Sequence, residues 1–157
     1  MTNRRQIRHE EHLIQKGVVK WARDIANSYK MLGKWHPLAL LHSIPNGEER
    51  PLTQVKGPGG KIIKVPLIGK RLKAEGLLAG IPDLHLPWAE HGFYSLYIEV
   101  KAPGGKQGLF DPKRKPGKLS DAQKEVIPLL EAAGNCVKVV YSTDQGIKIL
   151  KWYLRMR

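Results

Sequence analysis

The sequence predicts an α/β fold in which helices flank a mixed central β-sheet. Apolar residues recur at helical spacing near both ends of the chain, which predicts terminal helices. The middle of the chain instead holds short apolar runs, some with the alternation of strands, separated by Gly and Pro. With 157 residues and 41% hydrophobic composition, the chain can bury one substantial core, so we expect a single domain over residues 1–157.

The N-terminal half is predicted to contain two helices and two strand regions. From Glu11 to Tyr29 apolar side chains fall three or four residues apart, which predicts a helix preceded by a basic tail over residues 1–9. A short apolar run closed by Pro-Asn-Gly predicts a buried strand, and a Gly-Pro-Gly-Gly stretch predicts the turn of a hairpin. Pro66 favours the start of a second helix. These further elements are a strand over 38–44, a hairpin over 53–65 and a helix over 67–78.

The C-terminal half is predicted to contain two antiparallel strands, a basic loop, and then a helix, a strand and a helix. The two strands alternate in polarity and are joined by a tight turn containing Gly92. The loop combines Gly and Pro with five basic residues, which is typical of a flexible segment. Ser120 is a good N-cap for the next helix, and Gly134 stops it. The ranges are 83–88 and 93–101 for the two strands, 102–118 for the loop, 120–133 for the helix, 136–142 for the next strand and 143–156 for the last helix.

The charge of the chain indicates its kind of partner. Lys and Arg number 27 against 14 Asp and Glu, so the net charge is +13 and we expect a polyanion, above all nucleic acid. Charge alone suits a ribosomal or chromatin-like protein as well as an enzyme. The single Cys136 lies in an apolar run, which excludes an internal disulfide and predicts a buried thiol. No apolar run is long enough to span a bilayer, so we expect a cytoplasmic protein with no membrane partner.

The two strands over 83–101 place acidic and basic side chains together. Alternation puts Glu99 and Lys101 on one face of their strand, roughly 6–7 Å apart. If the apolar faces match, Leu84 pairs with Ile98, and Asp83 then lies opposite Glu99. This register requires a turn with an odd number of residues. The other pairs that it predicts are Leu86 with Leu96 and Trp88 with Tyr94.

The pairing of two carboxylates beside a lysine indicates a chemistry. Carboxylates about 5 Å apart repel each other unless a proton or a cation lies between them, and oxygen ligands suit Mg²⁺ or Mn²⁺. Such an ion can activate water on a phosphodiester, while Lys101 orients the water or stabilises developing negative charge. Asp83, Glu99 and Lys101 therefore predict phosphodiester hydrolysis, with His85 on the same face as Asp83. The alternative is an amphipathic strand with a solvated Glu99–Lys101 ion pair.

These residues resemble the signature of the PD-(D/E)XK nucleases. Gly80-Ile81-Pro82-Asp83, followed by Tyr97-Ile98-Glu99-Val100-Lys101, is similar to the core motif of that superfamily. Three further segments resemble its virus-type replication-repair nuclease (VRR-NUC) branch, and the likeness runs in order over nearly the whole chain. The segments are residues 11–15 (Glu-His-Leu-Ile-Gln), 44–50 (Ile-Pro-Asn-Gly-Glu-Glu-Arg) and 119–123 (Leu-Ser-Asp-Ala-Gln).

The resemblance implies a restriction-endonuclease-like core, dependence on Mg²⁺ or Mn²⁺, and cleavage that depends on DNA structure. Asp83 and Glu99 would be metal ligands together with the Val100 carbonyl, and Lys101 would be the catalytic lysine. Stand-alone phage and bacterial members of this family resemble homodimeric resolvases of four-way junctions. The implied setting is therefore the cytoplasm of a bacterial or phage-infected cell.

Two residues outside this core also match family motifs. Glu11 matches the acid of the N-terminal helix, with catalytic and metal-binding roles, and Glu10 would replace it if the register slips by one. The alternative for Glu11 is a carboxylate favoured by the helix dipole. Gln123 matches a fourth motif, in which it would hold the lysine or a water near the phosphate. Gln123 also forms a capping box with Ser120, which needs only hydrogen bonds at a helix start.

The expected DNA contacts are polar and basic residues in two loops. They are Asn46, Arg50, Lys106, Lys113, Arg114, Lys115 and Lys118. Residues 107–117 depart from the family pattern as an apparent insertion. The last helix carries two apolar stripes, one of which is a candidate dimer face. The leading hypothesis is a homodimeric junction resolvase; the alternatives are a nuclease for flaps, nicks or duplex DNA in repair or restriction, and a non-catalytic DNA-binding module.

Overall fold

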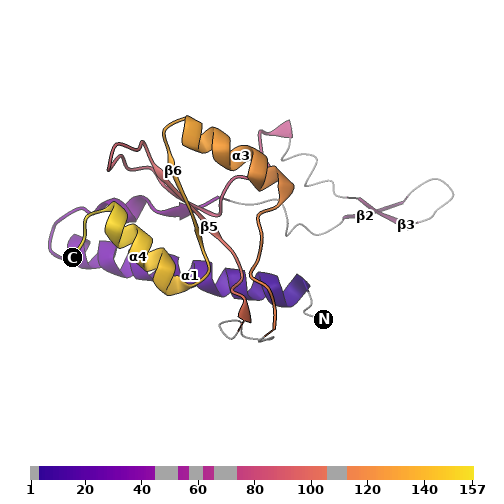
Figure 1. The fold of residues 1–157 in the computed structure, drawn as a ribbon, viewed down its shortest axis with the longest axis horizontal. Coiled ribbons are helices and arrows are strands. Elements are labelled where there is room, and N and C mark those ends of the chain that lie inside the picture. Colours follow the sequence, from indigo (N-terminus) through magenta and orange to yellow (C-terminus); the bar gives the residue numbers. More distant parts are fainter. Residues whose placement is uncertain (1–3, 45–52, 57–61, 66–73, 106–112) are drawn as a thin grey trace.

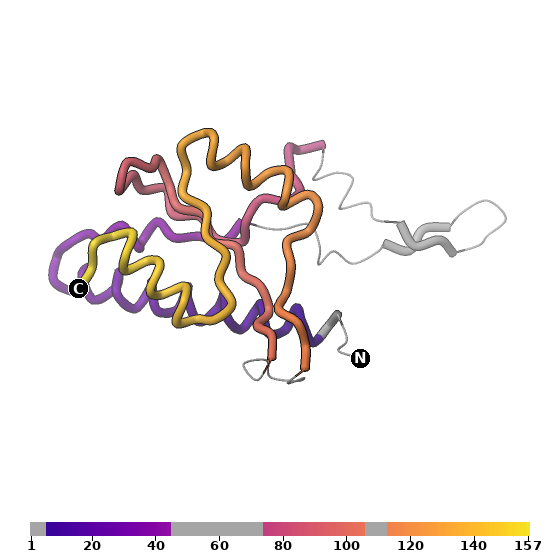
Figure 2. Tube along the Cα trace, viewed as in Figure 1, coloured from indigo at the N-terminus to yellow at the C-terminus, as the bar shows by residue number. Residues whose placement is uncertain are grey.

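A four-stranded mixed sheet forms the centre of the protein, in the order β1-β4-β5-β6 (Figures 1 and 2). The computed structural model describes residues 4–44, 53–56, 62–65, 74–105 and 113–157. β1 (His42–Ser43), β4 (Leu84–Leu86) and β5 (Leu96–Val100) pair antiparallel, whereas β6 (Cys136–Val140) joins β5 in parallel. The predicted α/β class with a mixed sheet is confirmed.

Helices cover both sides of this sheet. α1 (Arg4–Met31) and α4 (Thr143–Tyr153) pack on the apolar face, where Val18, Leu150 and the side chains of β4 and β5 form the core. α3 (Asp121–Ala132) lies on the other side and packs against β6 (Figure 1). Cys136 is buried, as predicted. No helix in the described part of the chain is long and apolar enough to cross a membrane.

The register of β4 and β5 is the predicted one. Leu84 pairs with Ile98 and Leu86 with Leu96, and these four side chains are fully buried. Their burial explains the register, because a slip by one residue would turn every apolar side chain to the other face. The polar side chains of both strands therefore lie together on the opposite face of the sheet.

The predicted pair of Trp88 with Tyr94 is wrong. Pro87 has no N–H for the ladder, and Trp88 N donates instead to the Leu86 carbonyl at 2.9 Å. Tyr94 N donates to the Gly134 carbonyl at 3.0 Å, so it leaves the ladder as well. The connection between the strands covers residues 87–95, an odd number as expected, but it is longer than a tight turn. Its tip is a two-residue turn at His91 and Gly92, whose φ angles of 54° and 81° suit a hairpin of type I′.

Two predictions in the N-terminal half need correction. α1 begins at Arg4, so the described part of the expected tail, residues 4–9, forms its first turns. The run over 38–44 is not one strand, because a 3-10 helix, η1 (Pro37–Leu40), precedes the two residues of β1. Pro37 fixes the first position of this turn, and the His36 ring accepts a hydrogen bond of 3.2 Å from Leu38 N. These local interactions favour the helical turn over an extended chain.

The hairpin predicted over 53–65 is confirmed as a separate sheet of β2 (Thr53–Lys56) and β3 (Ile62–Val65). Its turn, residues 57–61, lies outside the described residues. Most of the helix predicted over 67–78 also lies outside them. The described residues 76–78 are not helical, since Gly76 has a φ of 95°. The elements predicted after residue 120 are confirmed as α3, β6 and α4.

Candidate active site

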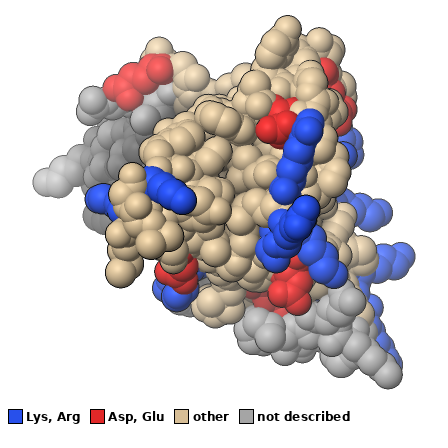
Figure 3. All heavy atoms as spheres, turned by 90° about the vertical axis from the view of Figure 1, so that its left-hand side faces the viewer, with Lys and Arg blue, Asp and Glu red and all other residues tan. Residues whose placement is uncertain are grey.

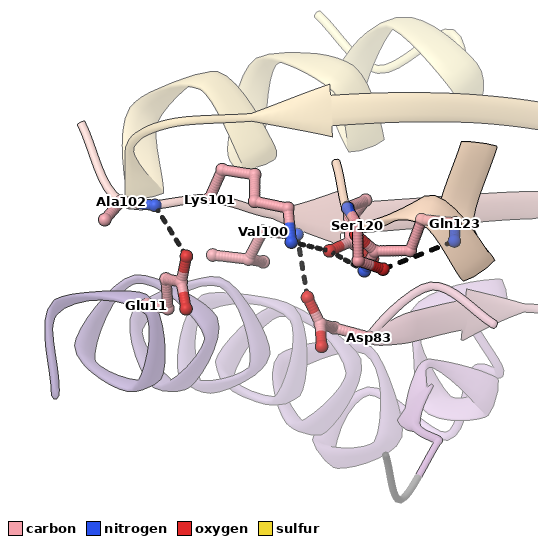
Figure 4. Close-up of polar contacts among 8 residues, drawn as sticks. Glu11, Asp83, Val100, Lys101, Ala102, Ser120 and Gln123 are labelled. Carbon is pink, nitrogen blue, oxygen red and sulfur yellow. Dashed lines mark hydrogen bonds and ion pairs between the residues drawn. The ribbon is translucent and has the colours of Figure 1, made fainter. Parts of the chain in front are cut away.

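The start of β4 and the end of β5 bring the carboxylates of Asp83 and Glu99 and the amine of Lys101 together. Figure 4 shows Asp83 and Lys101 at this end of the two strands. Asp83 directly precedes β4, and its Oδ2 accepts a hydrogen bond of 2.8 Å from Val100 N. Glu99 is only 1% exposed, and its Oε1 lies 2.7 Å from Lys101 Nζ. The Lys101 side chain is 13% exposed, so solvent reaches this ion pair mainly at the lysine. The structure therefore places the three predicted residues at one end of the strand pair.

The protonation of these groups is coupled. Burial, followed by the negative charge of Asp83, raises the pKa of Glu99 to about 7, although its bonds with Lys101 and Gln123 act against this. Burial opposes the charged form of Lys101, but the hydrogen bond and charge of Glu99 prevail and raise the pKa of that amine. Lys101 is therefore a cation at neutral pH. Because Asp83 disfavours the ionised form of Glu99, a second cation beside them would be favourable.

Gln123 joins the start of α3 to this pair. Its side-chain Oε1 accepts a hydrogen bond of 2.9 Å from Ser120 N, while the main-chain N–H of Gln123 donates to the Ser120 hydroxyl at 3.3 Å. This is the capping box that the sequence indicates. The Nε2 of the same side chain donates to Glu99 Oε1. One buried side chain thus caps a helix with its oxygen and holds the Glu99 carboxylate with its nitrogen.

Gly80 allows the segment before Asp83 to approach α3. Its φ is 88°, and a Cβ atom there would lie 2.3 Å from the carbonyl oxygen of Ala122. Both the conformation and the space therefore exclude other residues. The close contact fixes the chain entering β4 against the residue that precedes Gln123.

The two adjacent acids of α1 have separate contacts. Glu11 Oε1 accepts a hydrogen bond of 3.0 Å from Ala102 N, directly after Lys101, and its charge helps to raise the pKa of Lys101. Glu10 is 2% exposed and forms an ion pair with Arg114. Glu11 thus contacts the residue that follows Lys101, whereas Glu10 binds Arg114; the catalytic and metal-binding roles of Glu11 stay predictions.

Comparison with known proteins then identifies the family. A family model, that of the VRR-NUC domain, matches residues 66–144, which is half of the chain. The chain belongs to the VRR-NUC family. A solved structure titled "VRR_NUC domain protein" is similar to this chain, with a TM-score of 0.61 and 23% identity over 93% of this chain and 88% of that one. No curated protein matches the chain.

Membership of the VRR-NUC family makes this protein a nuclease domain of the PD-(D/E)XK type, with DNA as the substrate that such a domain implies. The structural neighbour and the mixed sheet confirm the restriction-endonuclease-like fold. The matched range contains Asp83, Glu99, Lys101 and Gln123. Glu11 lies outside it, so the place of that residue rests on its contact with Ala102.

The residues of the candidate site fit a divalent ion. Nuclease domains of this type generally use divalent metals. Glu99 Oε1 is held by Lys101 and Gln123, whereas Oε2 is buried and has no hydrogen-bond partner within the described part of the chain. Among the described residues no three His, Cys, Asp or Glu side chains form a ready metal cage. Mg²⁺ sites on phosphate substrates often use only one or two carboxylates, so this donor set is sufficient.

The predicted DNA contacts fall into three groups. Lys113, Lys115 and Lys118 are exposed. Arg114, between two of them, is not, because its side chain is 8% exposed and binds Glu10 and the Pro103 carbonyl. Its guanidinium is therefore occupied inside the protein rather than presented to DNA. Asn46, Arg50 and Lys106 lie outside the described residues.

Two contacts near the site could not be predicted from the sequence. The Glu10–Arg114 pair joins residues that are far apart in the chain, and only its burial reveals it. His85 was placed on the Asp83 face by alternation, but its stacking with Tyr97 at 4.3 Å becomes visible only in the structure. Burial, and then the charge of His42, lowers the pKa of His85.

Proposed function

We propose that this VRR-NUC protein is a metal-dependent, structure-specific DNA endonuclease that acts as a homodimer on four-way junctions. The observation that supports it best is the convergence of Asp83, Glu99 and Lys101, from two strands, with Gln123 and Glu11 beside them. A solvated ion pair would not explain this arrangement, because Glu99 is almost fully buried and one of its oxygens has no partner in the described chain.

Asp83, Glu99 and the Val100 carbonyl would hold Mg²⁺ or Mn²⁺. An ion bound there supplies an activated water and neutralises charge on the phosphodiester. Gln123 and Lys101 restrain one oxygen of Glu99, which leaves Oε2 as the oxygen for the ion. The main-chain bond from Val100 N to Asp83 fixes the other carboxylate relative to β5.

Lys101 would orient the attacking water or stabilise negative charge on a phosphate oxygen. In the metal-free protein, the hydrogen bond and charge of Glu99 raise the pKa of this amine, which favours its charged form. Its backbone is held firmly, because its N–H donates to the Val140 carbonyl at 2.9 Å and the next N–H donates to Glu11. Glu11 would thus position the lysine and add negative charge beside the ion.

Affinity for DNA would come mainly from many phosphate contacts outside this site. The net charge of +13 and the exposed Lys113, Lys115 and Lys118 support this role. These lysines follow the strand that carries Lys101, so they would bind the backbone close to the cut. Arg114 would fix the base of this loop instead.

The homodimer follows from the symmetry of the substrate. Paired cuts on a two-fold symmetric junction need two sites, and the described chain offers one. The stripes of α4 give less support than expected, since Leu150 and Tyr153 are fully buried and Ile149 and Leu154 pack against the core. Trp152 remains 45% exposed.

Exposed apolar side chains at one end of the molecule support the proposed homodimer better than α4 alone does. Uncharged surface predominates on the face shown in Figure 3, which is the side where α1 ends and the C-terminus lies (Figure 1). Large exposed side chains there offer area to a partner subunit. They are Met31 at 88% exposure, Leu32 at 72%, Trp35 at 56% and Trp152 at 45%.

A cleavage panel tests the proposal. Duplex, flap, fork and four-way DNA are incubated with the protein and Mg²⁺, Mn²⁺ or EDTA, while light scattering at micromolar protein gives the oligomeric state. Lys101→Ala is the inactive variant, and Lys124→Ala, at an exposed lysine of α3, is its matched control. We expect a dimer that cuts junctions best and only with metal. A monomer that prefers flaps or duplex contradicts the resolvase, and undiminished cleavage by Lys101→Ala contradicts the catalytic site.

A further inference from the structure

Three ring side chains occupy consecutive cross-strand positions beside the candidate active site. His42 on β1 pairs with His85 on β4, which pairs in turn with Tyr97 on β5. The rings of His85 and Tyr97 stack at 4.3 Å, and His42 meets His85 edge to face at 5.1 Å. They form one continuous row across three strands, which we call the ring row.

The ring row lies on the sheet face that carries the catalytic carboxylates. His85 is two residues from Asp83, and Tyr97 is two residues from Glu99, so alternation puts all four on the same face. The row is therefore displaced from the carboxylates by about 6–7 Å along the strands. This displacement is comparable to the spacing of neighbouring phosphates along one DNA strand.

The chemistry of the ring row suits a phosphate group. The stacked rings of His85 and Tyr97 cover each other's faces, so their polar edges remain for a ligand: an imidazole N–H and a tyrosine hydroxyl, both hydrogen-bond donors. His42 is exposed, while His85 and Tyr97 are half-buried. The His42 ring is held by a contact of 2.9 Å between its Nδ1 and the Leu40 carbonyl. This contact takes the single N–H of a neutral His42 ring, so Nε2 can donate to a phosphate only when the ring is protonated. His42 therefore holds the His85 ring in place from the solvent-exposed β1 side.

The ring row offers hydrogen bonds rather than charge. A phenol hydroxyl and a neutral imidazole N–H donate to phosphate oxygens without forming an ion pair. This difference separates the ring row from the basic loop, whose lysines bind DNA by charge.

We propose that the ring row of His42, His85 and Tyr97 is a subsite for the phosphate next to the one that is cut. This inference rests on the proposed nuclease function and names a further set of substrate-binding residues for it. It sets the position of the strand along β4 and β5, and thereby the linkage that reaches Asp83 and Glu99.

The test must keep the rings in place, because cross-strand ring pairs also stabilise a sheet. His42→Phe, His85→Phe and Tyr97→Phe retain a ring and remove its polar atoms. Tyr94→Phe is the matched control, since Tyr94 is 73% exposed and has left the strand ladder. Each protein is assayed on the best-cleaved DNA, in which one linkage at a time around the cut is an uncharged methylphosphonate.

In the wild type we expect one methylphosphonate beside the cut to raise KM about tenfold, as expected for a lost bond to a charged group. Tyr97→Phe or His85→Phe should raise KM similarly, and the same methylphosphonate should then have no further effect. Tyr94→Phe should respond like the wild type. The proposal is overturned if all three ring-row variants keep the wild-type response at every linkage.

DNA-binding measurements on the same variants separate this inference from the proposed nuclease function. Fluorescence anisotropy with Ca²⁺ in place of Mg²⁺ gives Kd for each DNA and variant. Coupling between a ring and one linkage, without cleavage in any metal, supports the subsite and contradicts the nuclease. Cleavage without coupling contradicts the subsite alone, and no DNA binding contradicts both.

Discussion

Replacing Arg114 by alanine removes one partner of a buried ion pair. The side chain of Glu10 is 2% exposed and that of Arg114 is 8% exposed. Bulk water therefore cannot easily replace either partner of the pair. The variant leaves the Glu10 carboxylate buried and also removes the donors to the Pro103 carbonyl. Breaking such a pair costs about 3–5 kcal/mol. Because Arg114 Nη1 is buried without a partner in the described chain, its removal recovers some desolvation energy, and we expect about 3 kcal/mol.

Thermal and urea unfolding measure this loss. For a chain of this size, about 3 kcal/mol corresponds to a fall in Tm of roughly 6–12 °C. Lys113→Ala and Lys115→Ala are matched controls, since they neutralise exposed neighbours and should change stability by less than about 0.5 kcal/mol. The double variant Glu10→Met with Arg114→Met should recover most of the stability, because apolar groups of similar volume often replace a buried pair at little cost. A loss in Arg114→Ala no larger than in the controls would refute the buried pair.

Three further predictions concern the proposed chemistry. Asp83→Ala and Lys101→Ala should abolish cleavage but keep DNA affinity in gel-shift assays, because many other charges supply it; a wild-type cutting rate in either folded variant contradicts the assignment. Neutralising Lys113 and Lys115 together should lower the slope of log K against log salt by roughly 2, since each phosphate contact contributes about 0.9; an unchanged slope removes them from the interface. Mn²⁺ at about 100 times its Kd should stabilise the wild type by about 2.7 kcal/mol in thermal shift, and Glu99→Gln should lose this gain; an equal gain in both excludes Glu99 as a ligand.

The central strands could be predicted because both of their faces are determined by the sequence. Strict alternation around Leu84 and Ile98 leaves one register that buries the leucines and isoleucine of both strands, and this register brings Asp83 close to the end of β5. The run over 38–44 lacks such alternation, and an apolar run without a period fits a strand and a helical turn equally. There the deciding interactions are local ones at His36 and Pro37.

Contacts between distant segments set the limit of prediction for the site. Arg114 lies between two exposed lysines in a basic loop, so nothing local separates it from them in the sequence. Its different environment depends on how α1 passes the end of β5, which brings Glu10 beside Pro103 and Glu11 beside Ala102. Which of Glu10 and Glu11 contacts the end of β5 depends on the same geometry, because adjacent side chains on a helix point about 100° apart.

Gln123 joins a helix cap to the candidate site. From sequence, the capping box and the family motif each explain the glutamine, and one residue can partly serve both roles. A side-chain amide carries both an acceptor and a donor. Here the oxygen accepts from Ser120 N, while the nitrogen donates to Glu99. Gln123→Glu would keep the cap but place a second carboxylate against Glu99, whereas Gln123→Ala would remove both bonds. The first position of α3 and the orientation of the Glu99 carboxylate are therefore set by one side chain, so the helix cap is part of the geometry of the candidate site.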